Sequence, residues 1–160
     1  MYRGNAEKKW SDDTSVRSVD LQKVIMLPRM PGMKTAAFTK RIIAFHETFA
    51  LMGSTKKNEF TRKKNISVVW HEAIAGRKAE EIAATFVKAL KHERDCKSII
   101  YWLDNCASQN KNWCLLTVLA SLVNSRDIRA EELTLSYFET GHTFMSADSV
   151  HHGVEEQMRR

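Results

Sequence analysis

The length, composition and charge of the chain already exclude several classes of protein. With 160 residues, 43% hydrophobic and 28% charged, it fits one soluble globular domain. No apolar run approaches the roughly 20 residues that cross a bilayer, and the N-terminus lacks a signal-peptide apolar segment, so we expect an intracellular protein. Three cysteines without a CxxC pair argue against a disulfide framework and against a cysteine-rich zinc site. A net charge of +6 favours a polyanionic partner, although basicity of this size is weak evidence on its own.

Hydrophobic patterning predicts the secondary structure. Residues 1–14 are polar and aperiodic, so we expect a tail or linker there and a single domain over residues 15–160. Runs rich in Val, Ile and Leu predict strands at Ser15–Leu27, Ile42–Met52, Ile66–Trp70, Ser98–Leu103 and Leu133–Phe138. Apolar residues at helical spacing predict helices at Arg77–Lys91, Asn110–Asn124 and Asp148–Arg160, with one or two further turns within Lys34–Arg41.

The order of these elements predicts the topology. Turn-forming residues between the second and third strands make an antiparallel hairpin the simplest connection. The later strands alternate with helices, as in parallel crossovers. We therefore expect an α/β fold with a mixed sheet of about five strands, the first three antiparallel, and helices on its faces.

Asp104, directly after the apolar strand SIIYWL, is the first candidate for a functional site. Reactive groups in open α/β sheets gather at the carboxyl ends of strands, and a carboxylate there is costly unless it is exposed, hydrogen-bonded or metal-bound. A helix N-cap would explain one polar residue at this place. It would not explain the polar run that follows, so we favour a site. That run contains Asn105, Gln109, Asn110, Lys111 and Asn112.

The last predicted helix carries a second group of candidates. Asp148, His151, His152 and Glu155 recur at spacings that place them on one helical face. Such a face suits metal ligation, and a polar solvated face is its rival. His142, just after the last strand, is placed to contact a phosphate or a metal-bound water.

Several basic residues are candidates for contacts with nucleic acid. Most of them crowd one short polar stretch, for which a solvated loop is an equal alternative, and Arg77 opens a helix where a solvent-exposed arginine is the simpler interpretation. The set comprises Lys56, Lys57, Arg62, Lys63, Lys64, Arg77 and Lys111.

Three blocks of the sequence are distinctive: WHEAIAGR at 70–77, DNCASQNKN at 104–112 and GHTFMSADSVHHGVE at 141–155. Together they resemble a transposon-derived domain of uncharacterised animal proteins, which is regarded as RNase H-like and related to DDE transposases and integrases. The resemblance runs from about Asp20 to the C-terminus. It implies that Asp20, Asp104 and Asp148 are the three metal-binding carboxylates, although Asp20 alone would be taken for an outward-facing strand residue. Asn105, Gln109, Asn110, His142, His151 and Glu155 would support them.

The chemistry that the resemblance implies is two-metal phosphoryl transfer on DNA. Three carboxylates would hold two Mg²⁺ or Mn²⁺ ions about 3.5–4 Å apart, water would cleave the DNA backbone, and the freed 3′-hydroxyl would attack target DNA. The resemblance also implies a nuclear location and a homo-oligomer. Two departures from the family are Ser108 where glycine is usual and the lack of an upstream DNA-binding segment, which suggests a fragment or a degenerate copy.

Three other functions compete with this interpretation. A domesticated or decayed transposase fragment would bind nucleic acid or protein and catalyse nothing. An RNase H or exonuclease would share the fold but act on another substrate. A zinc hydrolase built on His142, His151 and His152 would leave Asp20 and Asp104 unexplained.

Overall fold

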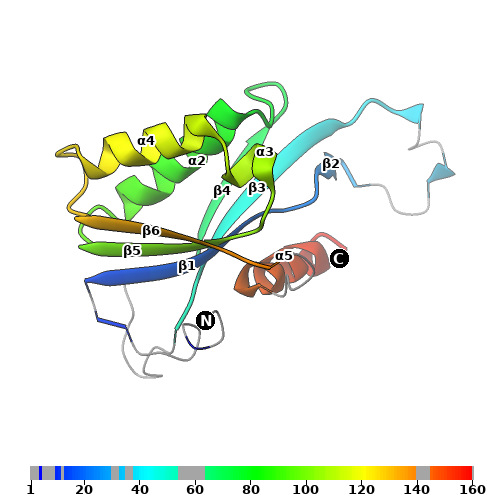
Figure 1. Cartoon of the computed structure of the whole chain (residues 1–160). Helices are drawn as coiled ribbons and strands as arrows, with labels where there is room; N and C mark the ends of the chain where they lie inside the picture. The colour runs from blue at the N-terminus through cyan, green and yellow to red at the C-terminus, as the bar shows by residue number, and fades with distance from the viewer. Residues whose placement is uncertain are drawn as a thin grey trace.

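The computed structural model describes residues 4, 10–11, 13–29, 33–34, 38–53, 64–139 and 145–159. Six strands form one mixed sheet, and helices lie on both of its faces (Figure 1). The strands are β1 Thr14–Leu21, β2 Ile25–Leu27, β3 Ile42–Leu51, β4 Ile66–His71, β5 Ser98–Leu103 and β6 Glu132–Tyr137. The helices are α2 Ala79–His92, α3 Ala107–Asn110, α4 Trp113–Val123 and α5 Ser146–Gln157.

The topology has an antiparallel part and a parallel part. β3 pairs antiparallel with β1, β2 and β4, whereas β5 lies parallel to β1 on its other side and β6 lies parallel to β5. The mixed α/β fold and the antiparallel pairing of the second and third predicted strands are therefore confirmed. None of the helices among the described residues has the length and apolar character needed to span a membrane.

The predicted strand Ser15–Leu27 is divided in two. Four residue steps separate Leu21 from Ile25, but only three separate their partners on β3, Glu47 and Ala44. The segment between β1 and β2 thus holds one extra residue, which is a bulge. The extra residue lies after Gln22, because the Gln22 amide still donates to the His46 carbonyl at 2.9 Å, in the register of β1 with β3.

The predicted helix Asn110–Asn124 is also divided. It forms α3 and α4, and Asn112 between them accepts a hydrogen bond from the Leu115 amide at 2.9 Å, which caps α4.

The last helix, α5, begins at Ser146, two residues before its predicted start. Residues 54–63, between β3 and β4, and residues 35–37, within the predicted turns at 34–41, lie outside the described residues.

The two faces of the sheet bury separate hydrophobic clusters. Helices α2 and α4 cover one face, and α5 covers the other (Figure 1). Val19 of β1 packs in the α2 and α4 cluster, whereas Val16 packs with Met145 and Ala147 at the start of α5. Because side chains alternate between faces along a strand, residues 16, 18 and 20 of β1 point toward α5.

A buried ion pair fixes β1 beneath α2. Arg17 Nε donates to Glu93 Oε1 at 2.8 Å, and Arg17 Nη1 donates to the carbonyls of Phe49 and Lys64. Glu93 also accepts from the hydroxyls of Ser15 and Tyr101. Both charges are therefore well satisfied, and the pair links β1, β3, β5 and the end of α2.

Candidate metal centre

Asp20 and Asp104 lie side by side at the carboxyl ends of two parallel strands. Val19 pairs with Leu103, so the next residue on each strand is one of the two acids. Burial and, to a smaller extent, the nearby carboxylates Asp104 and Asp148 together raise the pKa of Asp20 to about 6. The structure thus brings all three predicted carboxylates into one electrostatic neighbourhood.

Helix α5 carries the third carboxylate and a histidine to the same place. One ligand atom each from Asp20, Asp148 and His151 lie within 4.8 Å of one another. Asp148 is half-buried, and its Oδ2 accepts from the Met145 amide at 2.8 Å at the start of α5. His151 Nδ1 lies 3.5 Å from Asp20 Oδ2. These three residues provide two carboxylates and one imidazole to a common point.

Asp104 is held at the edge of this cluster by the loop that follows it. Asn110 Nδ2 donates to Asp104 Oδ1, and the Cys106 amide donates to the same oxygen at 3.3 Å. The Asn110 carbonyl accepts from the Tyr137 hydroxyl at 2.9 Å, which ties the loop to β6. Asn110 is buried, and its side chain orients the Asp104 carboxylate through this hydrogen bond.

A chain of buried polar side chains leads away from His151. Its Nε2 lies 3.0 Å from Thr48 Oγ1, and Thr48 Oγ1 lies 3.0 Å from His46 Nε2. His46 Nδ1 lies 2.7 Å from Oε1 of Gln22, the residue that directly follows β1. Burial lowers the pKa of His46, and burial followed by the neighbouring His46 lowers the pKa of His151 to about 4. Both rings are therefore neutral near pH 7.

The sequence-based predictions do not include His46, Thr48 or Gln22. The available signal was the run HisGluThr at 46–48, three polar residues in the middle of an otherwise apolar strand. All three are buried, and the alternation of β3 sends His46 and Thr48 toward α5 and Glu47 toward α2.

The remaining predicted residues do not belong to this group of ligands or lie outside the described residues. Asn105 is exposed, the Gln109 carbonyl accepts from Asn112, and Glu155 is half-buried and 3.9 Å from Arg159. The prediction that His152 shares a face with His151 is wrong, because His152 is exposed and pairs with Glu156. His142 lies outside the described residues.

The predicted basic residues fall into the same two groups. Lys64 and Arg77 are exposed, and Lys111 is exposed with its Nζ 4.6 Å from the centre of the Tyr137 ring. Lys56, Lys57, Arg62 and Lys63 lie outside the described residues.

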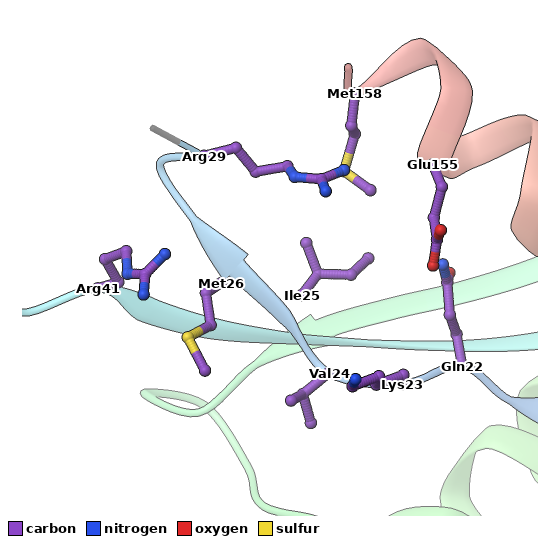
Figure 2. A pocket seen from close by; sticks show the side chains of 9 residues that line it. All are labelled: Gln22, Lys23, Val24, Ile25, Met26, Arg29, Arg41, Glu155 and Met158. Carbon is purple, nitrogen blue, oxygen red and sulfur yellow. The ribbon is translucent and has the colours of Figure 1, made fainter. Parts of the chain in front are cut away.

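A pocket of about 470 Å³ lies beside the histidine chain, between β2 and the end of α5 (Figure 2). Gln22 of the chain and Glu155, one turn after His151, form one wall. Figure 2 shows Arg29 and Arg41 at the side of the pocket opposite Gln22. The lining residues are Gln22, Lys23, Val24, Ile25, Met26, Arg29, Arg41, Glu155 and Met158. Three cations against one carboxylate give the pocket a positive balance.

Comparison with known proteins identifies a family for the C-terminal half. Residues 78–160 match the model of a family described as a domain of unknown function (DUF7869), and the match covers just over half of the chain. The chain belongs to this family. No curated protein and no solved structure matches the chain. The DUF7869 segment contains Asp104, Asp148 and His151, whereas Asp20 and Thr48 precede it.

The donor set of this DUF7869 protein fits a divalent cation. Carboxylate oxygens are the ligands of Mg²⁺ and Mn²⁺, and a neutral imidazole adds a nitrogen ligand. No ion pair with lysine or arginine is formed by Asp20, Asp104 or Asp148 within the described part of the chain. A bound cation would offset the repulsion that raises the pKa of Asp20.

Divalent cations are expected to stabilise the protein through this site. At a Mn²⁺ concentration of 100 times Kd the gain is about 2.7 kcal/mol, or roughly 5–10 °C in Tm for a chain of this size. Asp148→Asn should remove most of this gain, because it deletes a ligand charge but keeps an oxygen that can cap α5. Thermal unfolding with and without Mn²⁺ measures the effect. Asp127→Asn, at an exposed acid, is the matched control, and an equal gain in both variants would contradict the site.

A second prediction concerns Glu47, on the opposite face from the metal centre. Burial raises the pKa of Glu47 to about 8. Its Oε2 lies 2.6 Å from Thr85 Oγ1, which also lies 2.7 Å from the Ile82 carbonyl. One hydroxyl carries one proton, so both contacts are hydrogen bonds when Glu47 is protonated.

The folded protein should therefore hold the Glu47 proton up to about pH 8, whereas the unfolded chain releases it near the ordinary glutamate pKa of 4.5. The free energy of unfolding of the wild type should fall with rising pH, relative to Glu47→Gln, by up to about 1.4 kcal/mol per pH unit between these values. Urea unfolding in EDTA at pH 5, 6, 7 and 8 measures the difference. Glu80→Gln on the exposed side of α2 is the control, and parallel curves for wild type and Glu47→Gln would refute the assignment.

Proposed function

We propose that the protein is the nuclease core of a transposase- or integrase-like enzyme, which cleaves DNA and transfers strands with Mg²⁺ or Mn²⁺. The observation that carries this proposal is the convergence of Asp20, Asp104 and Asp148. They come from β1, from the end of β5 and from α5, and Asp20 interacts electrostatically with both Asp104 and Asp148. Three carboxylates at the carboxyl edge of a sheet are the ligand set of two-metal phosphoryl transfer.

The strand order supports an RNase H-like fold within the proposal. The resemblance implies three leading antiparallel strands followed by parallel strands reached through helices. β1, β3 and β4 form the antiparallel part, with β2 as a continuation of β1 along β3. β5 and β6 then add in parallel beside β1, each after a helical segment.

The residues of the chain have distinct parts in this reaction. Bound cations would activate the attacking oxygen and stabilise the leaving oxygen of the phosphodiester. Asp20 and Asp148 provide oxygen ligands from a rigid strand and from the first turn of a helix. Asn110 holds the Asp104 carboxylate through its Oδ1, which reduces the reorganisation that binding of a cation by Asp104 would require.

The basic pocket indicates where a DNA strand would lie. It shares Gln22 and Glu155 with the surroundings of the metal centre, so a strand that enters the centre can continue into it. Lys23, Arg29 and Arg41 offer phosphate contacts, which position a strand without reading its sequence. The apolar side chains of Ile25 and Met158 between them suit a sugar or a base. A DNA substrate is also the basis for a nuclear location.

The decisive test of the proposal is a nicking assay on supercoiled plasmid with Mg²⁺ or Mn²⁺. Asp104→Asn should reduce nicking to background because it removes a ligand charge, while its remaining oxygen still accepts from Asn110 and preserves the loop. Asp127→Asn changes the same atoms at an exposed site and should retain activity. Full activity in Asp104→Asn would refute the assignment.

Two further outcomes of this assay separate the competing functions. Wild-type protein that binds Mn²⁺ and DNA but cleaves nothing is a domesticated binding module. Cleavage of an RNA–DNA hybrid in preference to duplex DNA identifies an RNase H.

Charge removal in the pocket provides an independent prediction about DNA binding. The double variant Arg29→Gln/Arg41→Gln should weaken binding to duplex DNA equally for all sequences. It should also reduce the slope of log K against log salt by about 1.8, because each phosphate contact contributes about 0.9. Fluorescence anisotropy between 50 and 200 mM salt measures this slope. Arg126→Gln/Arg129→Gln, two exposed arginines before β6, carry the same charge change; an equal loss in that variant would show that net charge alone matters.

A further inference from the structure

The buried chain Gln22–His46–Thr48–His151 ends at the metal centre, and its geometry has a consequence for the choice of metal. We propose that this chain holds His151 with Nε2 protonated and Nδ1 free to bind a cation, so that the position formed by Asp20, Asp148 and His151 selects Mn²⁺ over Mg²⁺. The inference rests on the proposed function, because it specifies the metal of the same centre.

The first step is the direction of the hydrogen bonds. Gln22 Oε1 can only accept, so His46 Nδ1 donates to it across 2.7 Å. A neutral imidazole has one donor and one acceptor, which leaves His46 Nε2 as an acceptor. Thr48 therefore donates its one hydroxyl proton to His46 Nε2 across 3.0 Å.

The second step carries this direction to His151. Because the Thr48 proton is used toward His46, Thr48 Oγ1 can only accept from His151, and the 3.0 Å contact requires a proton on His151 Nε2. The other ring nitrogen, Nδ1, then presents a lone pair toward Asp20 Oδ2 at 3.5 Å. Two lone pairs that face each other repel unless a positive centre lies between them.

Burial keeps this direction fixed. The exposed fractions are 0% for Thr48, 3% for His46, 4% for Gln22 and 8% for His151, so water does not replace any donor or acceptor along the chain. Oε1 of the Gln22 carboxamide contacts His46, whereas Gln22 Nε2 is buried with no partner among the described residues. The backbone of Gln22 is fixed opposite His46, because the Gln22 amide donates to the His46 carbonyl at 2.9 Å.

The third step is the chemistry of the donors. Two ligands of one cation with bonds of about 2.1 Å lie about 3.0–3.4 Å apart, depending on the angle between them. The 3.5 Å between Nδ1 and Oδ2 is close to this spacing. Mg²⁺ favours oxygen ligands and keeps its water, whereas Mn²⁺ accepts carboxylates and also binds imidazole more readily than Mg²⁺ does.

The experiment compares wild type, Thr48→Val and Thr48→Ser by calorimetric titration with Mn²⁺ alone and with Mg²⁺ alone, in the absence of DNA. Valine has nearly the shape of threonine but removes the hydroxyl, whereas serine keeps it. We expect Thr48→Val to weaken Mn²⁺ binding about 10- to 100-fold, as loss of a residue that orients a metal ligand does, and to change Mg²⁺ binding much less. Thr48→Ser should restore the preference for Mn²⁺.

Two spectroscopic measurements test the same inference without depending on affinity. Nitrogen NMR of the metal-free protein should show His151 protonated at Nε2. Pulsed electron paramagnetic resonance of bound Mn²⁺ should show coupling to one imidazole nitrogen, which His151→Gln should abolish. Protonation at Nδ1, Mn²⁺ without nitrogen coupling, or an equal loss of both cations in Thr48→Val would each overturn the inference.

The failure of this inference can be told apart from failure of the proposed function. If neither cation binds the wild type, the metal centre itself is refuted. If Mn²⁺ and Mg²⁺ bind equally and without nitrogen coupling, only the role of His151 is refuted. Circular dichroism of the Thr48 variants confirms that each is folded before the titrations are compared.

Discussion

The packing of α5 on the sheet is the contact on which the site depends. The Ala147 amide donates to Ser18 Oγ of β1 at 3.0 Å, and Met145 and Ala147 are buried against Val16 and neighbouring residues of that face. This contact carries Asp148 into the neighbourhood of Asp20, where burial and like charge both oppose ionisation. Apolar burial must therefore stabilise an arrangement that electrostatics alone would separate. A bound cation would attract both carboxylates and so turn their mutual repulsion into a net attraction. Apolar packing and metal binding would then favour the same structure.

The treatment of buried charge differs between the two faces of the sheet. Toward α2, Glu93 is paired with Arg17 and receives further hydrogen bonds, which is what a structural ion pair requires. Glu47 on the same face has no ion pair among the described residues, and protonation removes its charge instead. Toward α5, Asp20 meets other carboxylates and a neutral imidazole. Charges that are crowded and left unpaired are typical of functional sites, whereas charges that are paired or neutralised are typical of a core.

The sequence predicted those parts of the fold and site that depend on local pattern. β5 and Asp104 follow from an apolar run that stops at a polar turn, and α5 follows from helical spacing. The division of the first strand could not be predicted, because the bulge exists only through the register with β3. Spacing also failed to separate His151 from His152, since the buried side of α5 is set by what it packs against. The polar chain through Thr48 joins residues 103 positions apart, and no local pattern reveals such a contact.

The family match begins at residue 78, whereas the metal centre also uses residues that precede it. Residues 78–160 carry Asp104, Asp148 and His151, but the partners of these residues precede that segment. His151 contacts Thr48 and Asp20, the Ala147 amide bonds to Ser18, and the whole length of β5 pairs with β1. Without β1 and β3 the matched segment would expose one edge of β5 and the buried side of α5, and it would lack one carboxylate and the residues that orient His151. The unit in which the chemistry of this site is defined therefore includes the strands before the matched segment, and functional comparisons within the family need to include the residues at positions 20, 46 and 48.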